Sequence, residues 1–143
     1  MFCDTEKKPH EQYEEIKEKI NTFHGIKDAA DSVVIFVNPC TMQIVIKHWI
    51  DKSIKSPAKP VNAPLIEECT GIKNYKGKQE QVQEMMELIT LDNYKTMRQR
   101  ISELGTNDSV LGNSNINTLF ERLESLNGDW IDEINMRLET CTP

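Results

Sequence analysis

The chain has 143 residues, of which 38% are hydrophobic and 28% charged, and its formal net charge is −6. This length suits one domain, and the composition excludes a disordered or membrane-embedded class. The longest strongly apolar run, residues 33–37, is far shorter than the roughly 20 residues that span a bilayer. Because the first residues also lack the apolar stretch of a secretory signal, we expect an intracellular protein of the cytoplasm or nucleus.

The four cysteines, Cys3, Cys40, Cys69 and Cys141, lie far apart along the chain. No two of them have the close spacing of a zinc half-site, so the pattern predicts no metal. We interpret them as thiols in a reducing compartment. Two disulfides in a secreted protein are the alternative.

The first predicted helix covers residues 9–25. Pro9 suits the first helical position, and Gly25 suits the end. Between them the apolar residues share one narrow face of the helix, and these are Tyr13, Ile16, Ile20 and Phe23.

Residues 28–55 allow two interpretations. The β-branched residues in 32–37 and 42–46 are typical of strands and would give a β-hairpin at 32–47. However, Asn38 is a good helix N-cap, Pro39 is a good first helical residue, and apolar residues on both sides recur at helical spacing. The hairpin turn would also contain no glycine. We therefore predict two buried helices here, with the hairpin as the alternative.

Three prolines, Pro57, Pro60 and Pro64, fall within residues 56–64. Proline removes a hydrogen bond from a helix interior and clashes with the preceding turn. We predict an irregular crossover at 56–77, with at most a single turn over residues 65–69.

Two further helices are predicted at 78–89 and 92–104. Both show apolar residues at helical spacing, but the phase shifts by roughly 90° between them, which indicates a break. Asp92 is placed to cap the second helix and Gly105 to end it.

The clearest pattern covers residues 116–138. Apolar residues recur there at spacings of three and four within an arc of about 140°, and the phase continues across Gly128. We predict one long amphipathic helix whose far end extends beyond the core and docks on a partner. The predicted partner interface is Leu126, Trp130, Ile134 and Leu138.

These patterns together predict an all-α fold, a single-domain bundle of about six helices with a long C-terminal helix. An α+β fold containing the hairpin at 32–47 is the alternative.

The charge is distributed unevenly. Residues 47–78 carry seven lysines against three acidic residues, whereas the segments on both sides are net acidic. Cations interleaved with an aromatic residue suit an anionic partner such as a nucleic-acid backbone, although no arginine is present to read bases. The predicted anion or nucleic-acid contacts are Lys52, Lys55, Lys59, Lys73, Tyr75, Lys76 and Lys78.

The sequence carries no motif of a catalytic site. Residues 71–79 contain two glycines followed by a lysine, but five residues lie between the glycines where a phosphate-binding loop has four, and a glutamine follows Lys78. The three histidines, His10, His24 and His48, stand in no recognisable nucleophile or metal-ligand pattern. We therefore predict no catalytic residue, cofactor or metal.

From these observations we expect a non-catalytic helical protein–protein interaction module, a small subunit or adaptor that binds a protein partner or its own copy. The alternative is a nucleic-acid-associated subunit that uses residues 47–78, with weak binding. No membrane association is predicted. A helical pattern alone does not identify the partner.

Overall fold

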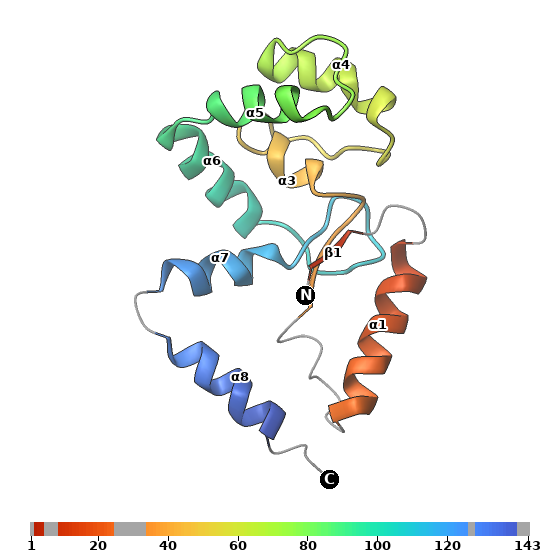
Figure 1. The fold of residues 1–143 in the computed structure, drawn as a ribbon, viewed down its shortest axis with the longest axis vertical. Helices are drawn as coiled ribbons and strands as arrows, with labels where there is room; N and C mark the ends of the chain where they lie inside the picture. Colours follow the sequence, from red (N-terminus) through yellow and green to blue (C-terminus); the bar gives the residue numbers. More distant parts are fainter. Residues whose placement is uncertain (1, 5–8, 25–33, 126–127, 140–143) are drawn as a thin grey trace.

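The computed structural model describes residues 2–4, 9–24, 34–125 and 128–139 (Figure 1). Most of these residues are helical, and the strands among them are two segments of three residues each. The predicted all-α class is therefore confirmed. The helices are α1 (Pro9–His24), α3 (Met42–Ile46), α4 (Lys59–Thr70), α5 (Gln79–Glu87), α6 (Leu91–Ser102), α7 (Ile116–Glu124) and α8 (Asp129–Glu139), and the strands are β1 (Phe2–Asp4) and β2 (Ile35–Val37).

The predicted helix upstream of Asn38 is wrong for residues 35–37, which form β2. The earlier part of that helix, residues 25–33, lies outside the described residues. The hairpin alternative is wrong as well, because β2 pairs in parallel with β1, aligning Phe2 with Ile35, and residues 42–46 are helical. All of residues 34–37 are buried. A strand buried on both faces shows no alternation that would distinguish it from a buried helix.

Strand β2 lies between two parts of the hydrophobic core. Val34 and Phe36 pack against the apolar face of α1, where Tyr13 is buried. Ile35 and Val37 point to the opposite face and pack against residues of α3, α6 and the start of α7, which are Ile44, Met97, Ile101 and Ile116. Because of this alternation, α1 packs on one face of β2, and α3, α6 and the start of α7 pack on the other face.

The second edge of β2 is covered by a loop and side chains. The amide group of Asn115 donates from Nδ2 to the carbonyl of Val34 (2.9 Å), and its Oδ1 accepts from the backbone N–H of Phe36 (2.8 Å). Ser114 Oγ donates to the carbonyl of Phe36 (2.6 Å), and an antiparallel bridge joins Val37 to Ser114. These bonds satisfy backbone groups that a third strand would otherwise pair.

The predicted helix that begins at Pro39 is much shorter in the structure, where α3 covers only Met42–Ile46. Its N-cap is Thr41 rather than Asn38. Asn38 instead binds the loop before α7, because its Nδ2 donates to the carbonyl of Asp108 (2.9 Å) and its backbone N–H to that of Asn113 (3.0 Å). The peptide bond between Asn38 and Pro39 is cis.

The irregular crossover predicted at 56–77 is wrong for its middle, which is the twelve-residue helix α4. Pro60 lies in the first turn, where no backbone N–H is needed. Pro64 does lie inside the helix, but α4 buries Asn62 and Ile66, and this packing outweighs the missing hydrogen bond. Gly71, with φ of 76°, ends the helix.

The predicted break between the helices at 78–89 and 92–104 is confirmed by α5 and α6. The cap of α6 is Thr90 rather than Asp92. Thr90 Oγ1 accepts from the backbone N–H of Asn93, and Asn93 Oδ1 accepts from that of Thr90, each at 3.1 Å. This reciprocal pair is a capping box with asparagine in place of the usual glutamate or glutamine.

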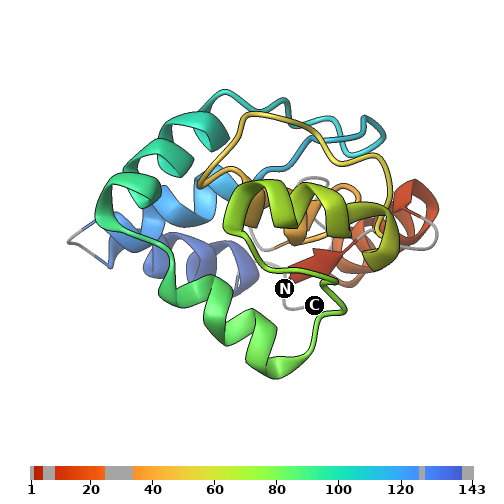
Figure 2. The same ribbon diagram turned by 90° about the horizontal axis from the view of Figure 1, so that it is seen from above.

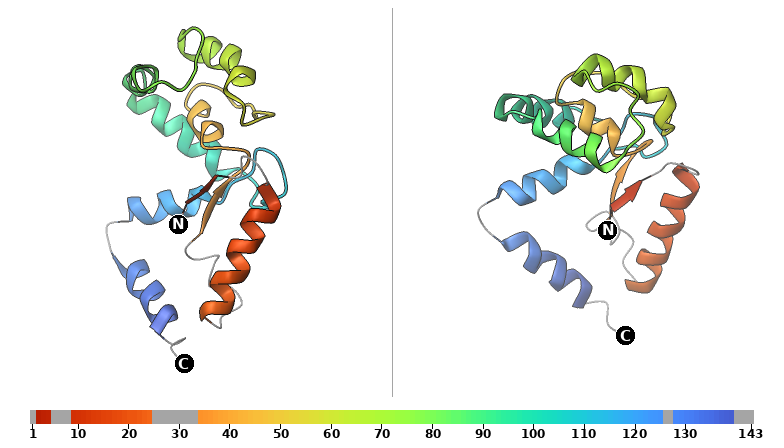
Figure 3. Two further views of the ribbon diagram at one scale, coloured as in Figure 1. Left: turned by 45° about the vertical axis from the view of Figure 1, so that its right-hand side comes forward. Right: turned by 45° about the horizontal axis from the view of Figure 1, so that its top comes forward.

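The single long helix predicted at 116–138 is wrong. Helix α7 ends at Glu124, Ser125 has an extended backbone (φ −66°, ψ 131°), and α8 begins at Asp129. The two helices run in different directions (Figures 1 and 3). Serine, asparagine, glycine and aspartate between the helices all favour turns and caps over helix interiors. The apolar phase across Gly128 therefore did not reflect one continuous helix.

Helices α3 to α6 gather at one end of the molecule, and α1 and α8 extend separately toward the other end (Figure 1). Seen from above, α4 crosses over α3 (Figure 2). A buried cluster fills the space beneath α4 and α5, and it consists of Ile66, Ile72, Tyr75 and Met85. Met42, Val45 and Trp49 pack against this cluster.

Candidate functional site

The predicted partner interface falls on α8 and the segment before it. Leu126 lies outside the described residues. Trp130, Ile134 and Leu138 belong to α8, but their side chains are outside the part of the chain that the structure describes. The structure therefore assigns their backbone to a helix and leaves their role as an interface a prediction.

The described apolar side chains around that interface are exposed. Leu123 at the end of α7 is 65% exposed, and in α8 Ile131 is 47% and Met136 63% exposed. All the other described side chains of α8 are exposed too. Helix α8 extends away from α3, α4, α5 and α6 in Figures 1 and 3. The described side chains of α8 are therefore exposed on the surface.

The predicted basic contacts lie around α4 and the loop that follows it. Lys52 forms an ion pair with Glu68 at 3.4 Å. The remaining five lysines are exposed, and no acidic group lies within 4 Å of their ammonium groups among the described residues. They are Lys55, Lys59, Lys73, Lys76 and Lys78.

Tyr75 behaves differently from the lysines beside it. Its side chain is only 5% exposed and packs in the cluster with Ile66, Ile72 and Met85. Burial, with a smaller contribution from nearby Cys40, raises the pKa of the Tyr75 phenol above its ordinary value. The ring is therefore not available to stack on a nucleotide base.

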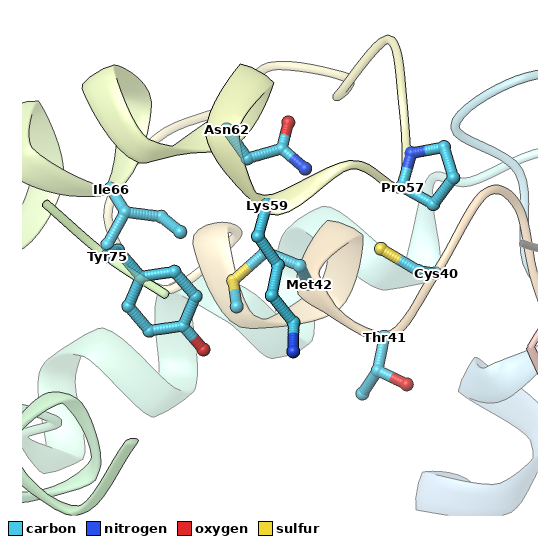
Figure 4. Close-up of a pocket in the computed structure, with 8 residues that line it drawn as sticks. All are labelled: Cys40, Thr41, Met42, Pro57, Lys59, Asn62, Ile66 and Tyr75. Carbon is cyan, nitrogen blue, oxygen red and sulfur yellow. The ribbon is translucent and has the colours of Figure 1, made fainter. Parts of the chain in front are cut away.

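The hydroxyl end of Tyr75 opens into a pocket of about 130 Å³ (Figure 4). The pocket lies between the start of α3, the segment leading into α4, α4 itself and the loop after it. Its lining side chains are Cys40, Thr41 and Met42, then Pro57, Lys59, Asn62 and Ile66, and Tyr75.

Asn62 Nδ2 donates to the carbonyl of Ser56 (2.8 Å), but three other polar groups of this pocket bind no described residue. Neither Tyr75 Oη nor Thr41 Oγ1 forms a hydrogen bond there, and Thr41 caps α3 without using its side chain. Lys59 Nζ forms no ion pair there. None of the lining residues is acidic, so the pocket offers donors without a matching anionic acceptor.

The position of Lys59 depends on a glycine across the pocket rim. A Cβ atom at Gly77 would lie 2.8 Å from Lys59 Nζ and 2.9 Å from its Cε. Gly77 also has a φ of 69°, a backbone conformation that residues with a side chain rarely adopt. The glycine therefore lets the lysine side chain lie flat across the loop.

A second pocket, of about 360 Å³, lies between α1, β2 and the region around α7. It is lined mainly by polar groups, and two of these already serve the fold. Asn115 binds the backbone of β2, and Lys17 Nζ lies 5.2 Å from the centre of the Tyr13 ring. This pocket therefore holds fewer uncommitted groups than the one at Tyr75.

Cys40, Cys69 and His48 also carry reactive side chains. Cys40 and Cys69 are thiols, and burial, followed by the nearby charge of Glu68, raises the pKa of Cys69. His48 contacts the carbonyl of Val45 through Nδ1 (2.8 Å), and burial lowers its pKa. Among the described residues, no three His, Cys, Asp or Glu side chains converge in a way that would hold a metal ion.

The pocket was missed in the sequence because its residues come from three separate segments. Lys59 and Tyr75 were chosen for charge and stacking, not for a shared cavity. Cys40, Thr41 and Asn62 had no distinguishing spacing at all.

No protein-family model matches the chain, and no curated protein or solved structure matches it either. Over the described residues, no helix combines the length and apolar character needed to cross a membrane.

Proposed function

We propose that the protein is a non-catalytic helical interaction module, a small subunit or adaptor of the cytoplasm or nucleus, that docks α8 on a protein partner. The observation that carries this proposal is the exposure of apolar side chains at the α7–α8 end, of which Ile131 is 47% exposed. Moving exposed apolar side chains out of water lowers the free energy, and an apolar groove on a partner would bury them.

Ile131 identifies the face of α8 that would dock. With about 100° of rotation per residue, Ile131 falls within an arc of about 100° that also holds the predicted interface residues of this helix. Those residues are Trp130, Ile134 and Leu138. Met136 lies about 140° from Ile131, on the opposite side of the helix.

The charge of α8 indicates the chemistry of the partner. Residues 129–139 carry four acidic side chains against one arginine. A second copy of α8 would bring like charges together, whereas a groove with basic residues at its rim would attract the helix. The proposed partner is therefore an apolar groove or amphipathic helix flanked by lysine or arginine.

The test uses Trp130 as a reporter. The chain has two tryptophans, so Trp49→Phe leaves Trp130 as the single tryptophan, which can be excited apart from the tyrosines. A synthetic amphipathic helix of leucine and lysine is titrated into this protein, with a leucine and glutamate helix of the same pattern as the control peptide. We expect saturable binding and a blue-shifted emission with the basic peptide alone.

Two variants of exposed side chains separate the docking face from the rest of α8. Ile131→Asp should weaken binding about tenfold or more because it removes an apolar contact, whereas Met136→Asp should leave binding unchanged. Equal binding of both peptides, or equal effects of both variants, would contradict the proposal. If the protein is instead a dimer and Ile131→Asp dissociates it, the partner of α8 is a second copy of the chain rather than a basic protein.

A second candidate is weak binding of a nucleic-acid backbone, favoured by the five exposed lysines that lack acidic partners within the described residues. Since Tyr75 is buried, such binding would rest on phosphate contacts alone. Labelled single-stranded RNA titrated at two salt concentrations tests it. Binding should fall steeply with salt and fall further when Lys73, Lys76 and Lys78 are changed to glutamine.

A further inference from the structure

The pocket at Tyr75 combines apolar walls with polar groups at one side. Met42, Pro57 and Ile66 supply apolar surface. Figure 4 shows the Lys59 ammonium group and the Tyr75 hydroxyl group on the same side of the cavity. At about 130 Å³ the pocket is close in size to the cavities of about 150 Å³ that accept a benzene ring.

The hydroxyl of Tyr75 faces the pocket rather than the core. The residue as a whole is only 5% exposed, because its ring packs with Ile66, Ile72 and Met85. Its oxygen forms no hydrogen bond with a described residue, and it is not sealed from solvent as Asn38 Oδ1 is. A ligand in the pocket can therefore bond to Oη without displacing a contact of the fold.

The uncommitted groups share one chemical preference. Lys59 Nζ only donates, and the hydroxyls of Thr41 and Tyr75 both donate readily. No carboxylate of the protein lines the pocket to receive these donors. A ligand that supplies an anionic oxygen would pair with all three and gain charge-assisted hydrogen bonds.

We propose that this pocket binds a small organic carboxylate, with the carboxylate against Lys59, Tyr75 and Thr41 and a compact apolar body against Met42 and Ile66. The apolar body distinguishes this ligand from inorganic phosphate. The inference is independent of the proposed function, because the pocket lies under α4 and α8 is at the other end of the molecule (Figure 1).

The experiment uses benzoate as the probe, titrated calorimetrically into the full chain. Benzamide, which has the same ring and no charge, and inorganic phosphate, which has charge and no ring, are the comparison ligands. We expect saturable binding of benzoate at one site and at least tenfold weaker binding of each comparison ligand.

Two substitutions test the two principal contacts. Tyr75→Phe removes only the hydroxyl, and Lys59→Gln replaces the ammonium with a shorter, neutral amide. Each should weaken benzoate binding about tenfold. Lys55→Gln is the matched control, because Lys55 is an exposed lysine of the same segment that does not line the pocket. It should bind benzoate as the unaltered protein does.

Thermal unfolding shows whether a variant that binds benzoate less tightly is still folded. Since Tyr75 Oη has no partner among the described residues, Tyr75→Phe should unfold at the same temperature as the unaltered protein or slightly higher. Weaker binding at unchanged stability supports the site. Absent or unsaturable benzoate binding, equal binding of benzamide, or undiminished binding by Tyr75→Phe would each overturn it.

Discussion

Glu124 illustrates how a single carboxylate joins two helices. It accepts hydrogen bonds from Arg98 Nε (2.6 Å) and Nη2 (3.0 Å) and from the hydroxyl of Tyr94 (2.7 Å). The guanidinium of Arg98 also lies 4.9 Å from the centre of the Phe120 ring. The two-pronged bond fixes the geometry of α7 on α6 better than a single contact would.

These bonds make the pairing of α6 and α7 sensitive to acid. The bonds from Arg98, followed by that from Tyr94, lower the pKa of Glu124 from 4.5 to about 2. A carboxyl group whose pKa is depressed by folding contributes stability above its unfolded pKa, and that contribution is lost as the pH falls toward its folded pKa. The window for this loss is therefore about pH 4.5 down to about pH 2.

We expect Glu124→Gln to flatten the pH dependence of unfolding in this window, because glutamine has no proton to gain there. Urea unfolding of both proteins at pH 5, 4, 3 and 2 measures the difference. Glu84→Gln is the control, since Glu84 is an exposed residue of α5 with no ion pair in the described structure. Parallel curves for the unaltered protein and Glu124→Gln would rule out this role.

Gln43 shows what sequence composition hides at the same scale. This polar residue is fully buried, and its amide accepts from the backbone N–H of Ile54 (2.7 Å) and donates to the carbonyl of Lys52 (3.0 Å). It therefore holds the chain after α3 in place. No pattern in the sequence indicated a buried glutamine, because its partners are backbone groups about ten residues away.

Helix α4 carries the main lesson at the scale of elements. Proline disfavours a helix interior, yet α4 accommodates Pro64 in its interior. Periodicity and propensity describe the preference of an isolated segment, and burial of Ile66 and Asn62 overrides that preference here. Where the apolar residues recur at clean helical spacing, as in α1, α5 and α6, the predicted helices were confirmed.

The two prolines of α4 give a matched test of this explanation. Pro64 cannot donate to the carbonyl of Pro60, so Pro64→Ala should restore a hydrogen bond and stabilise the protein by roughly 1–2 kcal/mol. Pro60 lies in the first turn, where the donor is not needed, so Pro60→Ala should have no stabilising effect. Thermal unfolding compares them, and equal shifts would show that the missing bond is unimportant.

The C-terminal helices show the limit of the phase argument. A helical period across residues 116–138 does not establish continuity, because two helices separated by a short turn share a phase by coincidence. The deciding feature is the extended backbone of Ser125. The sequence did predict that this region is amphipathic. Whether the apolar face of α8 packs in the core or binds a partner depends on where α8 lies in space.

At the scale of the whole molecule, the core is concentrated around β2 and α6. Val37, Met97 and Ile101 are all at most 1% exposed, whereas the described side chains of α8 are exposed. Regions with few buried contacts open more readily than the core. Stability should therefore differ strongly between these parts of the chain.

Hydrogen exchange measures that difference directly. We expect the amide protons of α8 to exchange much faster than those of α6, and the basic amphipathic peptide to slow exchange in α8 alone. Benzoate should instead protect the segments that line the Tyr75 pocket. Equal protection of α6 and α8 in the unbound protein would mean that α8 is packed as firmly as the core.

The covering of β2 also bears on how copies of the chain avoid one another. An open strand edge is a template for a strand of a neighbouring molecule, and many proteins block it with charge, proline or a further strand. Here the carboxamide of Asn115 occupies the backbone groups of Val34 and Phe36. Together with Ser114, this side chain occupies backbone groups that a strand of a neighbouring molecule would otherwise pair, and we expect its loss to open a site for edge-to-edge assembly.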